Sequence, residues 1–348
     1  MRRTRRRDGG RGLAPDWRAL LLGVAGLALA GTMVVGSLPE GSTASPGPPE
    51  SRAGETGAAT QARTHDPVPL AEPEECGDDE PFDPAESPLG ADRTLGDAVS
   101  AIKDAGELVV GVDQNSYRWG YRHPESGDLI GFDIDLAQAI AEDLLGPDPR
   151  VIFRAIPTAE REAALERGDV DMVVRSMSIT CDRLRHVAFS IPYFDTGQQL
   201  LVPGHSGITG LDETIDGLTV CSASRSTANV ELVRRDHGAE LMEMPNHLDC
   251  LVQVQLGLAD ALMTDSALAA GHIAQDPSMK LVGDELTTES YGVAMRPDDE
   301  DLVRWVNAVL EEYLGDEDDS RWQDSFDEWL RDYLPPNAVT PPEPRYRD

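Results

Sequence analysis

Short apolar strands alternate with amphipathic helices between residues 107 and 283, and this alternation constrains the fold more than any other feature. Repeated strand–helix–strand units form parallel sheets whose two faces are covered by helices. The alternation falls into two series separated by an extended stretch at 198–203, whereas a barrel would need one evenly spaced series. The sequence therefore predicts an α/β fold of two lobes, with a ligand cleft between them at the carboxyl ends of the strands.

The segments outside these series set the expected domain boundaries. Low hydrophobicity and frequent proline oppose regular structure at residues 39–92, and five prolines mark residues 335–348. The 242 residues in between are enough for two modest folded units. The expected order is a basic leader at 1–18, an apolar segment at 19–38, a flexible stalk at 39–92, lobe one at 93–198 and 286–334, lobe two at 199–285, and a Pro-rich tail at 335–348.

Residues 19–38 are an uncharged run that follows an arginine-rich leader. A helix of that length, rising about 1.5 Å per residue, matches the roughly 30 Å hydrocarbon core of a bilayer. Basic residues beside such a segment stay on the cytoplasmic side. We therefore expect an N-terminal membrane anchor that holds the rest of the chain at the outer face of the cell membrane. The alternative is a signal peptide cleaved near residues 28–30, which would give a secreted protein.

The net charge argues against nucleic-acid binding, and the cysteine spacing argues against a zinc site. The formal net charge of −33 makes a nucleic-acid partner unfavourable, because phosphate contacts need clustered cations. The four cysteines lack any CxxC spacing that would indicate zinc, and an even set in an exported protein indicates disulfides. Three connectivities are open to four cysteines. The cysteines are Cys76, Cys181, Cys221 and Cys250.

The sequence contains none of the common catalytic motifs GxSxG, HExxH, P-loop or GxGxxG. We therefore expect a binding protein without catalytic residues, metal or cofactor. The most informative stretch is 175–183, at the end of an apolar strand, which places Ser176 and Ser178 ahead of Arg183. A guanidinium with two short hydroxyls suits a carboxylate, because arginine offers two parallel donors and each hydroxyl adds another.

Lobe two offers complementary groups at two strand ends. Residues 224–229 open a helix, whose free backbone amides suit an anion. Asp265 ends an apolar strand, where its carboxylate suits an ammonium group, although a helix cap is also expected there. The sequence thus predicts a carboxylate receptor in lobe one, which closure of the lobes joins to an ammonium receptor in lobe two.

Five motifs in the order GELVVGVD, GFDIDLAQAIA, LERGDVDMVV, SITCDRLRHVAFSIPYF and DALMTD resemble a known family. They are similar to the amino-acid-binding family of extracytoplasmic solute-binding proteins of ABC transporters, over residues 95–334. The resemblance is closest to the glutamate- and glutamine-binding proteins of actinobacteria. It implies a periplasmic-binding-protein-like fold of type II, a free amino acid as ligand and an ABC permease as partner.

The resemblance also implies roles for individual residues. Arg183 would hold the α-carboxylate of the ligand, with Ser178 and Thr227 as supporting donors. Asp265 would receive the α-ammonium group from the other lobe. Arg175 stands where a cation would meet a carboxylate on the ligand's side chain.

Further implications concern the loop after the first strand and the cysteines. Tyr117 or Trp119 would pack over the ligand, and the alternative for either is packing on the lobe surface. The implied disulfides are Cys76–Cys181 and Cys221–Cys250. The first would tie the stalk to lobe one, and the second would lie within lobe two.

At residue 225 the chain departs from the family pattern, which has glycine where this sequence has Arg225. Glycine allows a positive φ and a close backbone approach that arginine adopts with difficulty. Either the Arg225 side chain replaces that contact or lobe two binds more weakly. A second cation near the cleft favours an acidic ligand, so we expect glutamate or aspartate before glutamine or asparagine.

Two other functions compete with uptake. A membrane-tethered sensor would pass ligand occupancy to a membrane partner, and the expected anchor suits that role. A dehydratase-like enzyme on the same scaffold would need an acid or base in the cleft, for which Glu289 is the candidate.

Overall fold

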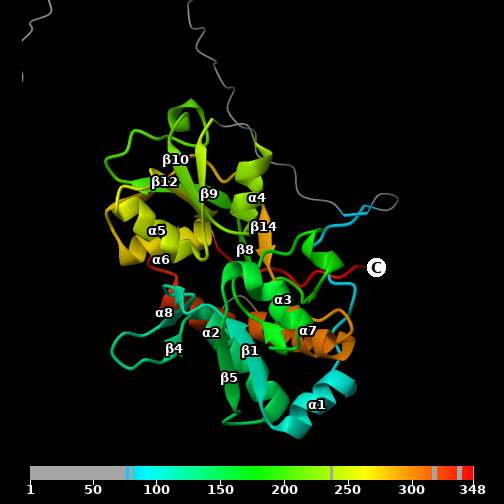
Figure 1. The fold of residues 1–348 in the computed structure, drawn as a ribbon. Coiled ribbons are helices and arrows are strands. Elements are labelled where there is room, and N and C mark those ends of the chain that lie inside the picture. Colours follow the sequence, from blue (N-terminus) through cyan, green and yellow to red (C-terminus); the bar gives the residue numbers. More distant parts are fainter. Residues whose placement is uncertain (1–75, 78–80, 236–237, 316–319, 335–338, 348) are drawn as a thin grey trace, which may run out of the picture. The chain divides into compact units, whose positions relative to one another are not determined.

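The computed structural model describes residues 76–77, 81–235, 238–315, 320–334 and 339–347, which form two α/β lobes (Figure 1). The expected leader, apolar segment and stalk up to residue 75 lie outside the described residues. Among the helices in these ranges, none combines the length and the apolar character that a membrane crossing requires.

Lobe one is built on a five-stranded sheet in the order β5-β1-β6-β15-β7. β1 (Leu108–Val112) lies between β5 (Val151–Ala155) and β6 (Met172–Val173) and runs parallel to both. β15 (Ala294–Met295) pairs antiparallel with β6 and with β7 (Ala188–Phe189). Because β15 follows lobe two in the sequence, lobe one is assembled from two separate stretches of chain.

Helices of lobe one each bury an apolar face. In α2 (Phe132–Leu145), Phe132, Leu136 and Ile140 are fully buried at intervals of about one helical turn, as an amphipathic helix packed on a core requires. The other elements of this lobe are α1 (Asp97–Ala105), β2 (Asn115–Ser116), β3 (Gly120–Arg122), β4 (Leu129–Ile130), η1 (Thr158–Glu160), α3 (Arg161–Glu166), η2 (Arg183–Arg185), α7 (Glu300–Leu314) and α8 (Arg321–Trp329).

Lobe two holds a second five-stranded sheet in the order β11-β10-β12-β9-β13. β10 is parallel to β11 and β12, whereas β9 runs antiparallel to its neighbours. Successive residues of β10 point to opposite faces, so Val220 packs with Leu232 of α4 and Cys221 packs with Leu251 of α5. The elements are β9 (Gln198–Pro203), η3 (Glu213–Ile215), β10 (Thr219–Ala223), α4 (Thr227–Arg234), β11 (Glu240–Met244), α5 (His247–Gln255), β12 (Ala261–Asp265), α6 (Ser266–Gln275) and β13 (Met279–Val282).

Two chain segments, 194–198 and 285–291, connect the lobes and are called the crossing segments below. They contain β8 (Phe194–Thr196) and β14 (Glu289–Tyr291), which pair antiparallel. A connection of a few residues is where a two-lobed protein bends when it closes on a ligand. A direct contact also joins the lobes, since the Trp119 indole donates to the Ala267 carbonyl of α6 at 3.1 Å.

The described residues of the expected stalk and of the Pro-rich tail pack against each other and against lobe one. The Ser87 amide donates to the Arg345 carbonyl at 3.0 Å. The Arg345 guanidinium lies 3.1 Å from Asp83 and 3.3 Å from Asp195 of β8. Composition did not predict this packing, because proline disfavours helix and sheet interiors but leaves neighbouring residues able to form hydrogen bonds and ion pairs.

Both disulfides implied by the resemblance are present in the structure. Cys76 is bonded to Cys181, and Cys221 is bonded to Cys250. The second bond links β10 to α5 inside lobe two, where both cysteines are fully buried.

Replacing Cys221 and Cys250 together with alanine is expected to lower the free energy of unfolding by about 2–4 kcal/mol. The bond closes a loop with a sequence separation of 29 residues, and opening it frees the unfolded chain. Urea unfolding under oxidising conditions measures the loss. In reductant the difference from the wild type should largely disappear, and peptide mapping that found free thiols here would contradict the prediction.

Candidate functional site

Charged and hydroxyl side chains gather at the carboxyl ends of strands in both sheets, where open parallel sheets bind their ligands. In lobe one, Asp113 follows β1 directly and Arg175 follows β6 by two residues. In lobe two, Thr227 opens α4 after β10, and Asp265 is the last residue of β12. Thr227 is half-buried and the other three are buried.

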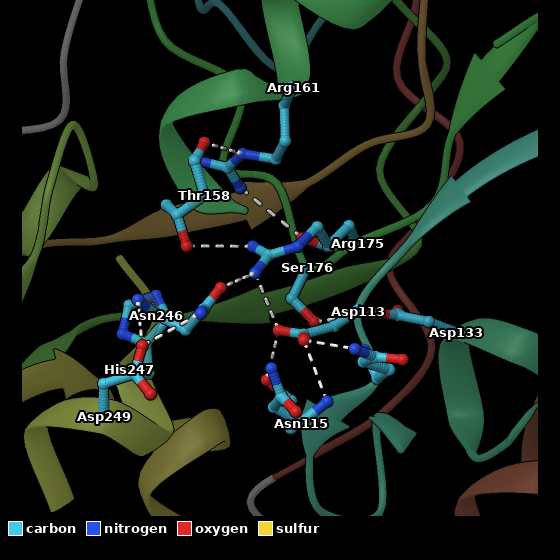
Figure 2. Close-up of polar contacts among 12 residues, drawn as sticks. Asp113, Asn115, Asp133, Thr158, Arg161, Arg175, Ser176, Asn246, His247 and Asp249 are labelled. Carbon is cyan, nitrogen blue, oxygen red and sulfur yellow. Dashed lines mark hydrogen bonds and ion pairs between the residues drawn. The ribbon is translucent and has the colours of Figure 1, made fainter. Parts of the chain in front are cut away.

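Arg175 is the centre of a buried polar network that joins the lobes (Figure 2). Its guanidinium lies 2.8 Å from the Asp113 carboxylate and donates to the Thr158 hydroxyl at 3.0 Å. It also donates at 3.2 Å to the side-chain oxygen of Asn246, the capping residue of α5 in lobe two. The resemblance implies a place for Arg175 opposite the ligand's side chain. In the structure its counter-ion is Asp113, and it contacts Asn246 across the lobes.

Arg183 opens η2 and is 6% exposed. Its guanidinium donates to the Ser178 carbonyl at 2.6 Å and to the Arg225 carbonyl of lobe two at 3.3 Å. The carboxylate of Glu162 is 4.0 Å away. Burial lowers the pKa of Arg183, although nearby carboxylates oppose the shift. A buried guanidinium held mainly by neutral carbonyls can form strong charge-assisted hydrogen bonds with a ligand carboxylate.

Ser176 and Ser178 lie in different surroundings. Ser176 has a φ of +42°, which is uncommon for a residue with a side chain. Its hydroxyl donates to Asp133 at 2.8 Å, and its amide donates to the Tyr193 hydroxyl at 3.1 Å. Ser178 is buried and forms a β-bridge with Tyr291 of the second crossing segment. The Ser176 hydroxyl is therefore engaged within lobe one, whereas Ser178 adjoins the hinge.

A third buried arginine, Arg161, was not among the candidate site residues named from the sequence. It opens α3, is 4% exposed, and donates to the carbonyls of Thr158 at 3.0 Å and Arg175 at 3.4 Å. Within the described ranges, no carboxylate lies within 4.0 Å of its guanidinium. Burial lowers the pKa of Arg161 well below its usual value, and the charges of Arg183 and Arg175 add to the shift. One feature of the sequence could have drawn attention to Arg161: it stands at the start of a helix, where the helix dipole disfavours a cation.

Asp265 is held by a chain of side-chain hydrogen bonds. Its carboxylate accepts from the Gln198 amide at 2.9 Å, and the same amide donates to the Thr227 hydroxyl at 2.9 Å. Thr227 in turn donates to Glu289 of β14 at 2.8 Å. Burial, with the nearby charge of Glu289, raises the pKa of Asp265 to about 8. The lobe-two carboxylate is thus bonded directly to Gln198 of the first crossing segment and linked through Thr227 to Glu289 of the second.

Arg225 adopts a φ of +59°, a conformation that glycine takes without strain. For a residue with a side chain this conformation costs roughly 1–2 kcal/mol. The side chain is exposed, and the backbone carbonyl accepts from Arg183. Arg225 therefore contacts lobe one through its backbone carbonyl, and a contact of its side chain with the ligand stays a prediction.

The two aromatic candidates differ in burial. Trp119 is fully buried, and its ring packs edge-to-face on Phe194 at 4.8 Å and on Tyr291 at 5.7 Å between ring centroids. Tyr117 is half-buried and packs edge-to-face on Tyr121 at 4.8 Å. Trp119 therefore occupies a core position, whereas Tyr117 keeps some exposed surface.

Comparison with known sequences matches this chain to the family that its motifs resemble. A model of the bacterial extracellular solute-binding proteins, family 3, matches residues 108–332. The ABC transporter glutamine-binding protein GlnH of Bacillus subtilis is 32% identical over 236 residues, spanning 68% of this chain and 85% of that protein. The glutamate-binding protein GluB of Corynebacterium glutamicum is 31% identical, spanning 65% of this chain and 80% of that protein.

Two solved structures share the fold. An ancestral arginine-binding protein bound to glutamine has a TM-score of 0.59 and 31% identity, covering 65% of this chain and 98% of that one. A solute receptor for L-cysteine of Neisseria gonorrhoeae has a TM-score of 0.64 and 25% identity, covering 69% of this chain and 98% of that one. Each of the four compared proteins is described by an amino acid that it binds.

Proposed function

This chain belongs to the bacterial extracellular solute-binding proteins, family 3, with a two-lobed type II binding-protein fold, and on that premise we propose that it binds a free acidic amino acid. The proposed ligands are glutamate and aspartate, ahead of glutamine and asparagine. The proposed place of binding is the outer side of the cell membrane. The protein is not an enzyme, because the relatives and structural neighbours compared above are solute-binding proteins, so Glu289 needs no acid–base role.

The observation that carries the proposal is the arrangement of three buried cations. Arg175 has a carboxylate at 2.8 Å, whereas the nearest ion pair of Arg183 measures 4.0 Å, and Arg161 has none within that distance in the described ranges. A buried charge without a close partner is costly, so a carboxylate that binds beside it recovers free energy. Two such guanidinium groups suit a ligand with two carboxylates. Arg183 would take the α-carboxylate, and Arg161 the side-chain carboxylate.

Charge also argues against a basic ligand. The guanidinium groups of Arg161, Arg175 and Arg183 are near enough for the last two to lower the pKa of the first. A lysine or arginine ligand would bring a further positive charge into this surrounding, and like charges a few ångströms apart repel strongly where water is excluded. An uncharged side chain would leave Arg161 without a carboxylate. An acidic side chain therefore fits this surface best.

A thermal-shift screen of the full-length protein against the twenty amino acids tests the proposed ligand class. A ligand present at 100 times its dissociation constant adds about 2.7 kcal/mol of stability, so binding is easily detected. We expect the largest shifts with L-glutamate or L-aspartate. A larger shift with an apolar or basic amino acid would contradict the ligand assignment, and no shift with any of them would contradict amino-acid binding.

Arg161→Gln is expected to weaken L-glutamate binding by about tenfold or more, while L-glutamine affinity changes by less than about threefold. A hydrogen bond to a charged group contributes about 1.5–3 kcal/mol, which is lost only for the ligand with a side-chain carboxylate. Calorimetry measures both affinities. Arg167→Gln is the control, because Arg167 is exposed near the end of the same helix. Equal losses for both ligands would contradict the assignment of Arg161 to the side chain.

The proposed partner is an ABC permease that takes up the ligand. This choice follows the B. subtilis relative, which is named as an ABC transporter component. The alternative partner is a membrane sensor protein, to which this chain, held by its expected N-terminal anchor, would pass the information that ligand is bound. Permease and ATPase genes beside this gene would support uptake, whereas a gene for a multi-span receptor or kinase would support sensing.

A further inference from the structure

The crossing segments contain two buried polar atoms that have no hydrogen-bond partner among the described residues. They are the side-chain oxygen of Gln198 and the hydroxyl of Tyr291, and both residues are fully buried. Most buried polar atoms in native proteins have a partner, and an unsatisfied one costs about 1–3 kcal/mol. A ligand N–H donor beside the crossing segments would supply the partner that the Gln198 oxygen lacks in the described part of the chain.

Hydrogen bonds join the Gln198 side chain directly to one carboxylate and, through Thr227, to a second. Its amide nitrogen donates to Asp265 and to Thr227, both at 2.9 Å. Thr227 and Thr287 then donate to the two oxygens of Glu289, each at 2.8 Å. An ionised carboxylate accepts about four hydrogen bonds, so Glu289 can accept more than these two.

The charge of this region favours a cation. Asp265 and Glu289 are 4% and 9% exposed. In the part of the chain that the structure describes, neither lies within 4.0 Å of a basic nitrogen. The pKa of Asp265 is raised mainly by burial and next by the charge of Glu289, as expected when two carboxylates lie near each other. An ammonium group bound between the two carboxyl groups would offset this repulsion and favour the ionised form of Asp265.

We propose that Glu289 and Gln198 complete, together with Asp265, the receptor for the ammonium group of the bound amino acid. The inference rests on the proposed function and adds a part of the site that the crossing segments supply, in addition to the two lobes. An ammonium group has three N–H donors. The acceptors for them are the two carboxylates and the Gln198 oxygen. Thr227 and Thr287 are positioning residues that orient Glu289.

This receptor links the ammonium group to hinge closure. Asp265 belongs to lobe two and Glu289 to a crossing segment, so a shared ammonium group holds the two together when the lobes close. A dicarboxylate without an amine would bind next to both negative charges and gain nothing from them. The site should therefore distinguish L-glutamate from glutarate, which has the same carboxylates and no amino group.

The test measures L-glutamate and glutarate binding to the full-length protein by calorimetry, in the wild type and in Glu289→Gln. Glutamine keeps the shape of the side chain and removes its charge. We expect L-glutamate affinity to fall by about tenfold or more, and glutarate affinity to stay within about threefold or to rise. Glu166→Gln, at an exposed position in α3, is the matched control and should change neither affinity.

Equal loss of both ligands, or unchanged L-glutamate affinity, would overturn the inference and leave the proposed function intact. If the wild type binds an amino acid other than L-glutamate, that amino acid replaces L-glutamate in the test, and its analogue without the amino group replaces glutarate. The same changes in affinity then support or overturn the inference. A wild type that binds no amino acid would overturn the proposed function and this inference with it. If Glu289→Gln does not fold, Glu289→Asp carries the test, because it withdraws the carboxylate by one methylene group.

Discussion

Replacing Arg183 with alanine is expected to weaken amino-acid binding by about 30-fold or more. Arg183 is 6% exposed, and its guanidinium donates to the carbonyls of Ser178 and Arg225. A ligand carboxylate that binds there forms a largely desolvated pair with it. Truncating one partner of such a pair costs about 2–5 kcal/mol. Calorimetry of the full-length protein with L-glutamate measures the change directly.

Arg185 provides the matched control for this variant. It lies in the same short helix, but it is exposed and pairs on the surface with Asp182. Exposed ion pairs contribute at most about 1 kcal/mol, so Arg185→Ala should bind like the wild type. Near wild-type affinity in Arg183→Ala would show that the ligand carboxylate binds elsewhere. Urea unfolding of both variants separates a loss of binding from a loss of folding.

The fold could be predicted because its units are encoded locally. Each apolar strand followed by an amphipathic helix specifies a parallel unit, and the break near residue 203 separates two series of them. The order of strands in the lobe-one sheet could not be predicted from these local units, because β15 joins that sheet only after the chain has passed through all of lobe two. The packing of the tail on β8 through Arg345 was missed for a related reason, because composition carries no information on distant ion pairs.

The candidate site was chosen from residues that end an apolar strand or follow one. Asp265 ends β12, and Arg183 lies in the short helix η2 after β6. Both are buried, and their roles in ligand binding stay predictions. Arg161 and Gln198 were missed because their importance depends on what surrounds them in three dimensions. Whether a buried arginine has a carboxylate beside it is a tertiary property that no local motif reveals.

The assignment of Trp119 shows the same limit. An aromatic residue in a loop beside a strand end is equally compatible with a ligand contact and with core packing. In the structure the indole has no exposed surface and donates across the lobes to the Ala267 carbonyl, as a residue packed in the core would. A half-buried neighbour such as Tyr117 cannot be told apart from it by sequence alone.

Arg175→Ala is expected to lower the free energy of unfolding by about 3–5 kcal/mol, in addition to any effect on ligand binding. The Arg175 and Asp113 side chains are 3% and 5% exposed and lie 2.8 Å apart. Removing the cation leaves the Asp113 charge buried without its counter-ion, although the carboxylate still accepts from the Ser116 hydroxyl at 2.8 Å. The variant also loses the hydrogen bond to Asn246 across the lobes. Urea unfolding of the full-length protein, followed by tryptophan fluorescence, measures the change.

Two comparisons make this result specific to the buried pair. Arg167→Ala removes an arginine whose pair with Asp169 is exposed, and should cost at most about 1 kcal/mol. Combining Arg175→Met with Asp113→Asn removes both charges at similar volume, and should recover part of the stability lost in Arg175→Ala. Wild-type stability in Arg175→Ala, together with a reversed preference between L-glutamate and L-glutamine, would instead show that Arg175 contacts the ligand's side chain. Arg161 would then have no separate role in specificity, because one cation would account for the acidic preference.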